Sequence, residues 1–418
     1  MTMSNTSCSG SNPQPQDVAK EMLLRLDLEL ISCVEIQTLW AGYGHICEVK
    51  ARRTTQLGSA AIPEIESHGG VIDLILKIVS PPSGRGDEGH LRKIFSYEVE
   101  QYFYDEVAPT LQRVPLAKCL SSTSGNRNLA VAAGLANVNA TLMSDLRQKY
   151  PVAGEKRAVL TRQQVHSALR WLANFHGSYW NAPAKSLDGF ILPPLQENTL
   201  RQGKQGTARK GLWLNGGYTY LATRGSEYRS LLQDHDSEWP SLLCQPVPNS
   251  ALSTTELAAE FLTPRGRPFE TYIHGDVKSE NMFSTETGDE VALFDFQYVG
   301  LGLGVCDLAK LFTCSVPMDM LLGSGQLHSQ LVMSDGERAL LEEYRKHLLS
   351  REGGAATPSY DWGTFKRHWE TALVDWCRFQ ASWGFWGNTE WLQARVRSIV
   401  CDEQWVNWLR RDVDELGE

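Results

Sequence analysis

The sequence predicts an α+β protein with two lobes: a small, sheet-rich N-terminal lobe at residues 17–144 and a larger, mostly helical C-terminal lobe at residues 145–418. The chain has 418 residues, which is more than a single core usually holds. Runs rich in β-branched residues are concentrated before residue 144, whereas the C-terminal part repeats apolar residues at helical spacing. We expect residues 1–16, which are polar and lack apolar periodicity, to form a disordered tail.

Composition and charge exclude several classes of protein. The 42% of apolar and 21% of charged residues are ordinary for a globular chain. A formal net charge of -9 without a large basic tract argues against nucleic-acid binding. The chain starts without the basic and apolar regions of a secretory signal, and no apolar run is long enough to span a membrane. Nine cysteines without a Cys-x-x-Cys pair indicate reduced thiols, so we expect a cytoplasmic protein. No pattern indicates its oligomeric state.

The first elements of the chain set up a glycine-containing turn. Residues 18–39 mix apolar and charged positions in a helical fashion, so we expect a helix there. Gly42 and Gly44 then precede an alternating, strand-like run. Such a turn is either an ordinary hairpin turn or one whose backbone N–H groups approach phosphates closely. Its position ahead of the next strand favours the second alternative.

A charged residue interrupts the next predicted strand. Residues 71–79 are rich in β-branched side chains, and Lys77 lies among them. A lysine in a buried strand is costly unless it is paired, and the helix predicted at residues 90–107 offers Glu98 and Glu100 as partners. The alternative is an edge-strand lysine and a solvated glutamate. Two more strands, around a turn at residues 121–128, complete the lobe.

The first part of the C-terminal lobe combines a well-marked helix with a loop-rich region. Residues 161–164 form a capping-box signature that opens a helix, and His176 near its end is expected in the core or at a cap. Residues 193–225 are rich in loop-forming residues. Their basic segment at 201–211 is either a solvated surface loop or a lid over a substrate.

The C-terminal region is rich in aromatic residues at three- and four-residue spacing, which predicts one apolar helix face. Core packing is the simpler explanation for this face. The alternative is that some rings, with Glu370 or Asp375 nearby, line a pocket for a flat or cationic molecule. The residues of this face are Phe365, Trp369, Ala372, Trp376, Phe379 and Trp383, and Trp386, Trp391, Trp405 and Trp408 follow them.

Residues 272–308 carry the strongest chemical signal. Asp276, Asn281 and Asp295 lie there on short polar turns between apolar, strand-like runs, so we expect the three side chains together at one edge of a small sheet. Transfer of the γ-phosphoryl group of ATP needs a carboxylate that orients the accepting hydroxyl and takes its proton, and oxygen ligands that hold magnesium. Asp276 fits the first role, and Asn281 and Asp295 fit the second.

The order of residues in this stretch resembles known kinase motifs. His274, Asp276, Lys278 and Asn281 follow the His-x-Asp-x-Lys-x-x-Asn order of the protein-kinase catalytic loop, and Asp295 begins a segment similar to the metal-binding Asp-Phe-Gly. The sequence departs from regulated protein kinases in having His-Gly for His-Arg and Asp-Phe-Gln for Asp-Phe-Gly. No activation loop ending in Ala-Pro-Glu fits after the second motif.

These departures resemble the aminoglycoside phosphotransferase and choline kinase group, and Asp-Phe-Gln is especially similar to its ecdysteroid-kinase-like members. The resemblance implies a bilobal, protein-kinase-like fold that uses ATP and Mg²⁺. It also implies that Lys77, braced by Glu100 in a Glu-x-x-Phe-Tyr pattern, holds ATP phosphates, and that Lys278 steadies the γ-phosphate.

Two further roles come from the same resemblance. The backbone of Met143 and Ser144 would hold the adenine at the hinge between the lobes, although Ser144 stands where relatives have a glutamate. Asp307 would steady the catalytic loop through its backbone, or else cap the helix that begins there.

We therefore expect an enzyme that phosphorylates the hydroxyl of a small molecule, such as an amino-alcohol, a sugar-like or a steroid-like acceptor. Two alternatives remain open at this point: a protein serine/threonine kinase, and a nucleotide-binding scaffold without catalysis. The sequence does not identify the acceptor.

Overall fold

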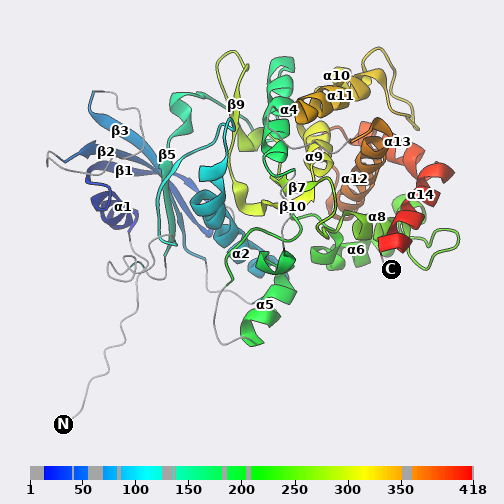
Figure 1. Ribbon diagram of the computed structural model, residues 1–418, viewed down its shortest axis with the longest axis horizontal. Coiled ribbons are helices and arrows are strands. Elements are labelled where there is room, and N and C mark those ends of the chain that lie inside the picture. The colour runs from blue at the N-terminus through cyan, green and yellow to red at the C-terminus, as the bar shows by residue number, and fades with distance from the viewer. Residues whose placement is uncertain are drawn as a thin grey trace, which may run out of the picture. The chain divides into compact units, whose positions relative to one another are not determined.

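The computed structural model describes residues 14–39, 42–54, 69–81, 86–124, 135, 138–180, 186–203, 209–350 and 360–416 (Figure 1). Its residues divide into two compact units, one of residues 1–86 and 117–145 and the other of residues 87–116 and 146–418. Sheet dominates the first unit and helices the second, which confirms the α+β prediction. Residues 87–116, assigned to the N-terminal lobe on sequence grounds, cluster with the second unit.

The first unit is a five-stranded antiparallel sheet with strand order β1-β2-β3-β5-β4. β-branched residues favour these strands because their side chains pack well on a pleated surface. The predicted strand at 71–79 and the two strands after residue 114 are confirmed. The strands are β1 (Leu28–Thr38), β2 (Gly44–Arg53), β3 (Val71–Val79), β4 (Cys119–Ser122) and β5 (Asn139–Ser144).

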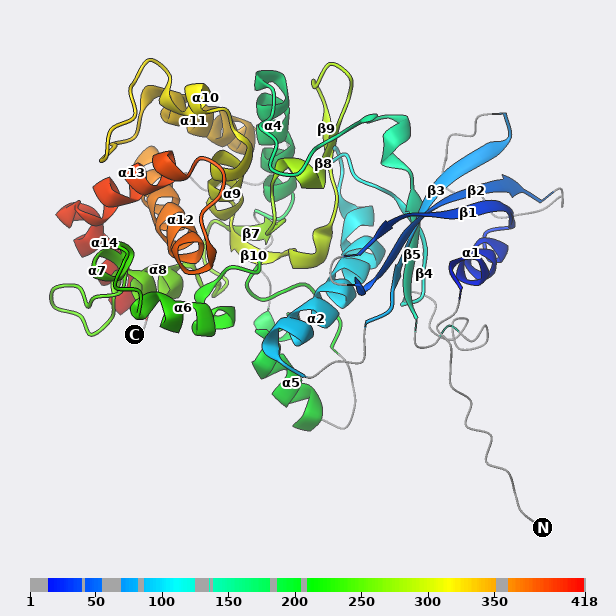
Figure 2. The same cartoon turned by 180° about the vertical axis from the view of Figure 1, so that it is seen from behind.

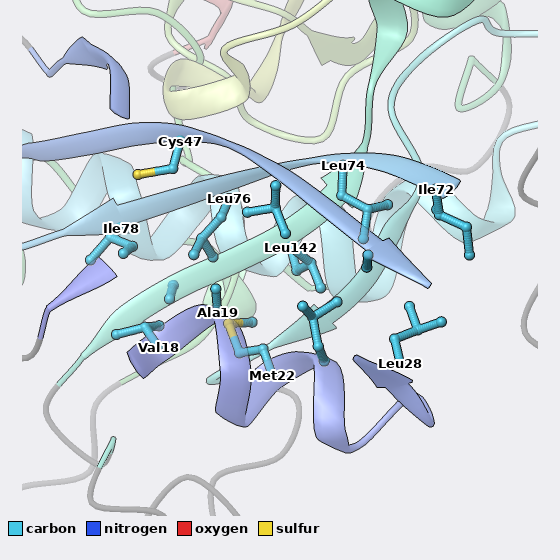
Figure 3. Packing of buried hydrophobic residues seen from close by; sticks show 14 of the residues in the cluster. Val18, Ala19, Met22, Leu28, Cys47, Ile72, Leu74, Leu76, Ile78 and Leu142 are labelled. Atoms are coloured by element: carbon cyan, nitrogen blue, oxygen red, sulfur yellow. The ribbon is translucent and has the colours of Figure 1, made fainter. Parts of the chain in front are cut away.

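Helix α1 (Pro15–Leu24) covers this sheet. It buries Val18, Ala19 and Met22, and Figure 3 shows these side chains directed toward the strands. They meet apolar residues such as Leu76 of β3 and Leu142 of β5, all of them completely buried. Each fully buried aliphatic side chain contributes roughly 1.5–3 kcal/mol. This helix therefore closes the core of the first unit.

The helix predicted over residues 18–39 is wrong in its second half. Helix α1 ends at Leu24, Asp27 turns the chain with a φ of 53°, and β1 starts at Leu28. Hydrogen bonds to β2 along the length of β1 outweigh the local helical pattern. The helix also begins at Pro15, inside the tail predicted at residues 1–16; residues 1–13 of that tail lie outside the described residues.

The second unit contains two small sheets among helices. One pairs β7 (Glu270–Ile273) with β10 (Gly300–Leu303), and the other has the order β6-β8-β9, with β6 at Val152–Ala153, β8 at Met282–Ser284 and β9 at Val291–Leu293. All of these strands except β6 and the start of β7 come from residues 272–308, the predicted motif region. The hairpin of β8 and β9 and the strand β7 therefore position the loops between them.

Helices make up most of the second unit. Figure 2 shows α9 and α12 within it, with α13 and α14 beyond them. None of the helices in the described ranges is long and apolar enough to cross a membrane. The α-helices are α2 (Glu88–Tyr102), α4 (Arg162–Gly177), α5 (Pro194–Gly203), α6 (Gly225–Leu232), α7 (Trp239–Leu243), α8 (Thr254–Leu262), α9 (Val305–Ser315), α10 (Met318–Leu322), α11 (Asp335–Leu349), α12 (Trp362–Trp383), α13 (Thr389–Val400) and α14 (Glu403–Leu416).

Predicted helix signals in this unit have mixed outcomes. The capping box at the start of α4 is confirmed, because Thr161 and Gln164 exchange side-chain and backbone hydrogen bonds. The loop predicted over residues 193–225 is wrong in part, because α5 forms there. Arg201 of α5 is not a solvated loop residue: it pairs with Glu197 and Glu98 at 2.8 and 2.9 Å.

A buried polar cluster joins three helices of the C-terminal region. Glu337 of α11 accepts hydrogen bonds from Trp369 of α12 at 2.8 Å and from Arg395 of α13 at 2.8 and 3.0 Å. All three side chains are buried. Breaking such a buried ion pair by removing one partner usually costs about 3–5 kcal/mol. The cluster therefore fixes α12, which carries part of the candidate site.

Candidate active site

The loop that follows β7 is held by a buried carboxylate. Asp307 in the first turn of α9 accepts hydrogen bonds from the backbone N–H groups of His274 at 2.7 Å and Gly275 at 2.9 Å. Its side chain also accepts one from His176 Nε2 at 3.1 Å, and His176 Nδ1 contacts the Tyr344 hydroxyl at 2.7 Å. Asp307 thus fixes the loop backbone, as the resemblance implied, and does not cap α9, whose N-cap is Gly304.

The ionisation of these groups follows from their burial. Burial alone would raise the pKa of Asp307, but the hydrogen bond and charge of His176, with the charge of Lys310 nearby, bring it below its ordinary value. For His274, burial lowers the pKa. His274 Nδ1 accepts the N–H of Asp276 at 3.3 Å, so Nε2 carries the proton donated to the Phe294 carbonyl at 2.9 Å. A neutral histidine therefore supports the loop.

The glycine after His274 is required by packing. Gly275 has a φ of 83°, and a Cβ there would lie 2.4 Å from the carbonyl oxygen of Tyr298 and 2.6 Å from the nitrogen of Gly217. A larger residue would collide with these backbone atoms in a conformation that L-residues rarely adopt. This explains why the sequence has His-Gly here and not the His-Arg of protein kinases.

Three of the predicted residues lie together on this loop. Asn281 Nδ2 donates to Asp276 Oδ2 at 3.0 Å and to its backbone carbonyl at 2.8 Å. Lys278 Nζ lies 3.1 Å from Asp276 Oδ2 and 2.9 Å from Glu280. Burial alone would lower the pKa of Lys278, but these two carboxylates outweigh it and raise the pKa. Lys278 is therefore a cation held beside Asp276.

The backbone brings Asp295 next to these residues. Met282 pairs with Leu293 in the β8–β9 hairpin, and Phe294 N–H donates to the carbonyl of Asn281 at 3.1 Å. Asp295 follows with a φ of 66°, which is uncommon for a non-glycine residue and typical of functional sites. Asn281 and Asp295 thus lie at the same end of the hairpin.

The residues after Asp295 anchor it in the core. Phe296 is fully buried and stacks on Phe103, with ring centroids 4.0 Å apart. Gln297 accepts hydrogen bonds from Ser96 of α2 at 3.3 Å, through its side chain, and from Trp213 Nε1 at 2.9 Å, through its backbone carbonyl. Gln297 therefore connects its own segment with those of Ser96 and Trp213. A glycine at this position would keep the backbone contact with Trp213 and lose the side-chain contact with Ser96.

The donor atoms here fit magnesium. Because Asn281 Nδ2 donates twice to Asp276, its amide oxygen is left for another partner. A carboxylate and an amide oxygen are hard ligands of the kind that Mg²⁺ prefers, and nucleotide phosphates and water usually complete its shell. The described residues contain no cluster of three or more His, Cys, Asp or Glu that could hold a metal alone.

A cavity of about 190 Å³ opens beside Asp276. Asp276, Lys278 and Glu280 line one side of it, and Lys310 and Cys314 of α9 line another. Four aromatic residues, Tyr218, Trp376, Trp383 and Trp386, also line it, together with the cations Lys156 and Arg157. Trp376 and Trp383, from the predicted aromatic helix face, thus line a cavity; that this cavity binds a substrate stays a prediction.

Two acidic residues that the sequence suggested for this pocket lie elsewhere. Glu370 pairs with Lys366 and Arg367, and Asp375 pairs with Arg378 at 2.6 Å. Neither lines the cavity. Glu370 and Asp375 do lie on the same helix as the aromatic rings, as the sequence periodicity predicted. Each forms ion pairs with basic residues three or four positions away on that helix.

Two phenols share the environment of Asp276. Burial and then the charge of Asp276 raise the pKa of Tyr218 well above its ordinary value and that of Tyr298 to about 12. Their rings lie 4.8 Å apart, measured between centroids. Both hydroxyls therefore stay protonated at neutral pH and can donate hydrogen bonds.

Several residues of this site were not predicted from the sequence. Tyr218 and Lys310 come from segments without a recognised motif, and His176 was expected only as a core or cap residue. The positions of His176 and Lys310 depend on the packing of α4 and α9 against the loop, and the Tyr218 ring packs against Tyr298 and Phe379. Of these residues, only Lys310 could have been placed from the sequence. It follows Asp307 by about one helical turn and so lies on a similar face of α9.

The glutamates of α2 have different environments. Glu98 pairs with Arg201, and burial raises its pKa despite that pair. Glu100 is buried with 6% exposure. Arg201 is therefore the partner of Glu98, and the role of Glu100 that the resemblance implied stays a prediction.

In the first unit, Lys77 is buried on β3 with 8% exposure. A Cβ on Gly44 would lie 2.0 Å from the Ile78 carbonyl oxygen, so the approach of β3 requires this glycine; Gly42 has a φ of 73° and open space around it. The Ser144 N–H donates to the Lys118 carbonyl at 2.9 Å. Met143 lies next to Ser144 in β5 and pairs with Ile75 of β3 and Cys119 of β4. A nucleotide-binding role for these residues stays a prediction.

Comparison with solved structures returned small-molecule kinases. A macrolide 2'-phosphotransferase from Brachybacterium faecium has 13% identity and a TM-score of 0.42, covering 91% of this chain and 97% of that one. The choline kinase LicA from Streptococcus pneumoniae has 15% identity and a TM-score of 0.36, covering 95% and 99%. A Plasmodium vivax ethanolamine kinase has 11% identity and a TM-score of 0.39, covering 96% and 84%.

A comparison with curated proteins gave no match. The family comparison gave one, over residues 66–326, which is more than half of the chain and includes both the β3 lysine and the whole loop from His274 to Asp307. This chain belongs to the ecdysteroid kinase-like family.

Proposed function

We propose that this protein transfers the γ-phosphoryl group of ATP, with Mg²⁺, to a hydroxyl group of a small molecule. The observation that carries the proposal is the position of Asp276, which lines an aromatic-walled cavity and is hydrogen-bonded to the proposed magnesium ligand Asn281. The cavity would hold the acceptor, and the end of the β8–β9 hairpin would hold the metal.

In the proposed reaction, Asp276 accepts a hydrogen bond from the acceptor hydroxyl and takes its proton. The hydroxyl oxygen forms a bond to the γ-phosphorus as the bond to the β-phosphate oxygen breaks, which releases ADP. Asn281 and Asp295 would orient the magnesium ion, which supplies charge neutralisation to the phosphates. Lys278, held beside Asp276 by two carboxylates, would stabilise negative charge on the transferred group.

The course of the chain after Asp295 supports a small acceptor. Protein kinases build their peptide platform from the segment between the metal-binding Asp and Ala-Pro-Glu. Here the chain passes through one short 3-10 turn (Phe296–Tyr298) and β10 directly into α9. No exposed segment of that kind is present between Asp295 and Asp307, all of whose residues the structure describes.

The test is a screen of hydroxylated metabolites with ATP and Mg²⁺, read by mass spectrometry for a product heavier by one phosphoryl group. Peptide libraries and generic protein substrates form the parallel arm. We expect saturable phosphorylation of a small molecule and none of peptides. Phosphorylation of peptides alone would indicate a protein kinase, and nucleotide binding without turnover in either arm would indicate a scaffold.

A further inference from the structure

Lys310 is an unusual residue in the wall of the cavity. It lies on α9 and has only 5% of its surface exposed, yet it lines the cavity. In the described part of the chain, no hydrogen bond or ion pair joins its ammonium group to another residue. The centroid of the Trp376 ring lies 5.8 Å away, and the charge of Asp307, one turn earlier on α9, acts on the ammonium group from beyond ion-pair distance. A buried charge without a partner is costly, and such groups are normally paired.

The position of this ammonium group relates it to the proposed reaction. A Cβ on Gly217 would lie 3.1 Å from Lys310 Nζ and 3.5 Å from the Gly275 carbonyl oxygen. Nζ therefore lies beside the turn that directly precedes Asp276. A molecule that reaches Asp276 with its hydroxyl group can reach Lys310 with another group.

The charges around the cavity favour a negatively charged ligand. The lining contains four cationic side chains, Lys156, Arg157, Lys278 and Lys310, and two carboxylates, Asp276 and Glu280. Lys278 already pairs with both carboxylates. The other three cations, with Lys310 the most deeply buried of them, leave the cavity with an excess of positive charge. A cationic acceptor would be repelled, and it would find Trp376 already in contact with an ammonium group.

From these observations we infer that Lys310 binds a carboxylate of the acceptor, so that the acceptor is a hydroxylated carboxylic acid with a flat apolar body. The hydroxyl would face Asp276, the apolar body would lie among Trp376, Trp383 and Trp386, and the carboxylate would accept a charge-assisted hydrogen bond from Lys310. The phosphorylation of this acid rests on the proposed function, but its binding does not. The inference excludes amino-alcohols as acceptors.

The test compares three probes with the same hydroxymethyl-phenyl body and an anionic, a neutral or a cationic group at the other end: para-(hydroxymethyl)benzoate, its amide and the corresponding benzylamine. The cyclohexane counterpart of each probe is measured as well. Affinities are measured by calorimetry without ATP, and turnover is measured with ATP. We expect the acids to bind most tightly. Lys310→Met, which keeps the aliphatic stem, should weaken acid binding roughly tenfold to hundredfold and leave the amide within about threefold, because only a charge-assisted bond is lost.

Controls separate recognition from structure and from ATP binding. Lys310→Met should melt no lower than the wild type, because it removes an unpaired buried charge. Lys346→Met makes the same charge change at an exposed position of α11 outside the cavity and should leave acid affinity unchanged. A raised KM for ATP in Lys310→Met with unchanged acid affinity would overturn the inference, as would equal or tighter binding of the amide or amine, or no binding of any acid.

The two proposals can fail separately. Lys310-dependent binding of the acids without phosphoryl transfer to any acceptor would refute the proposed function and support the inference. Phosphorylation of amines as readily as acids, unaffected by Lys310→Met, would support the proposed function and refute the inference.

Discussion

Asp276 is the side chain on which the proposed reaction depends most directly. Asp276→Asn keeps the shape of the side chain but removes its ability to accept a proton, so we expect kcat to fall by about a hundredfold or more while ATP affinity changes little. Steady-state kinetics with calorimetric ATP binding provide the measurement. Asp289→Asn, the same change in an exposed hairpin turn, is the control. Turnover near the wild-type rate in Asp276→Asn would remove Asp276 from the role of base.

Asp295 is the corresponding test for the metal. Asp295→Ala removes a hard oxygen ligand, and we expect it to abolish the magnesium dependence of nucleotide affinity. The position has a φ of 66°, where alanine itself costs about 1–2 kcal/mol. Asp295→Asn tolerates that conformation better and loses only the charge, so it separates backbone strain from metal binding. An unchanged magnesium titration in both variants would exclude Asp295 from the metal site.

At the scale of elements, α12 connects the core to the cavity. Trp376 is buried and Trp383 is 58% exposed at the end of the helix, yet both line the cavity. Trp383→Ala should therefore raise the KM of the acceptor severalfold with little effect on the KM of ATP or on stability, because little buried surface is lost. Trp362→Ala, at the other end of the same helix and outside the cavity, is the matched control. Equal effects of the two variants on acceptor KM would argue against binding by Trp383.

The same helix carries a pH-sensitive residue. Burial, and then the charge of Arg267, lower the pKa of His368 from 6.5 to about 3, and the Tyr360 hydroxyl lies 2.5 Å from its Nδ1. Between these two pKa values the unfolded chain binds a proton that the folded chain does not. The free energy of unfolding therefore falls as the pH drops below 6.5, by about 2 kcal/mol at pH 5 for this one residue.

His368→Gln tests this expectation. Glutamine can still accept a hydrogen bond from Tyr360 but does not titrate, so the loss of stability between pH 7.5 and pH 5 should shrink by about 2 kcal/mol. Urea unfolding at the two pH values gives the comparison, with His328→Gln at an exposed position as the control. The same pH dependence in the wild type and His368→Gln would mean that His368 titrates normally in the folded protein.

At the scale of the whole molecule, the proposed activity needs both units. Lys77 belongs to the first unit and Glu100 to the second, and the resemblance predicts that they act together on the phosphates of ATP. Lys77→Ala and Glu100→Ala should each raise the KM of ATP, and the double variant should be little worse than either single one. Additive losses would mean that the two residues act separately. Coupling of Lys77 to Glu98 instead would be surprising, because Arg201 already pairs with Glu98.

The sequence by itself determined the features that rest on local chemistry. The capping box at Thr161, the strand around Lys77 and the helix with Glu100 follow from residue types a few positions apart. The loop from His274 to Asp295 was predicted as one site for the same reason, since short turns between strands leave little freedom in where its side chains lie. The spacing of these motifs also predicted the family. The family comparison, which matches residues 66–326, confirmed it.

Tertiary structure decided what depends on partners far away in the chain. Pairing with β2 made a strand of residues whose apolar positions follow a helical spacing. Arg201 is partly buried, and it pairs with Glu98, which is distant in sequence. The same holds for the cavity: helix periodicity could not tell that Trp376 faces it while Asp375 does not, or that Lys310 lies next to the turn before Asp276. Local patterns fix which face of an element is apolar. Which side chains meet across a cavity is fixed by the packing free energy of elements far apart in sequence, and no short window of sequence contains that information.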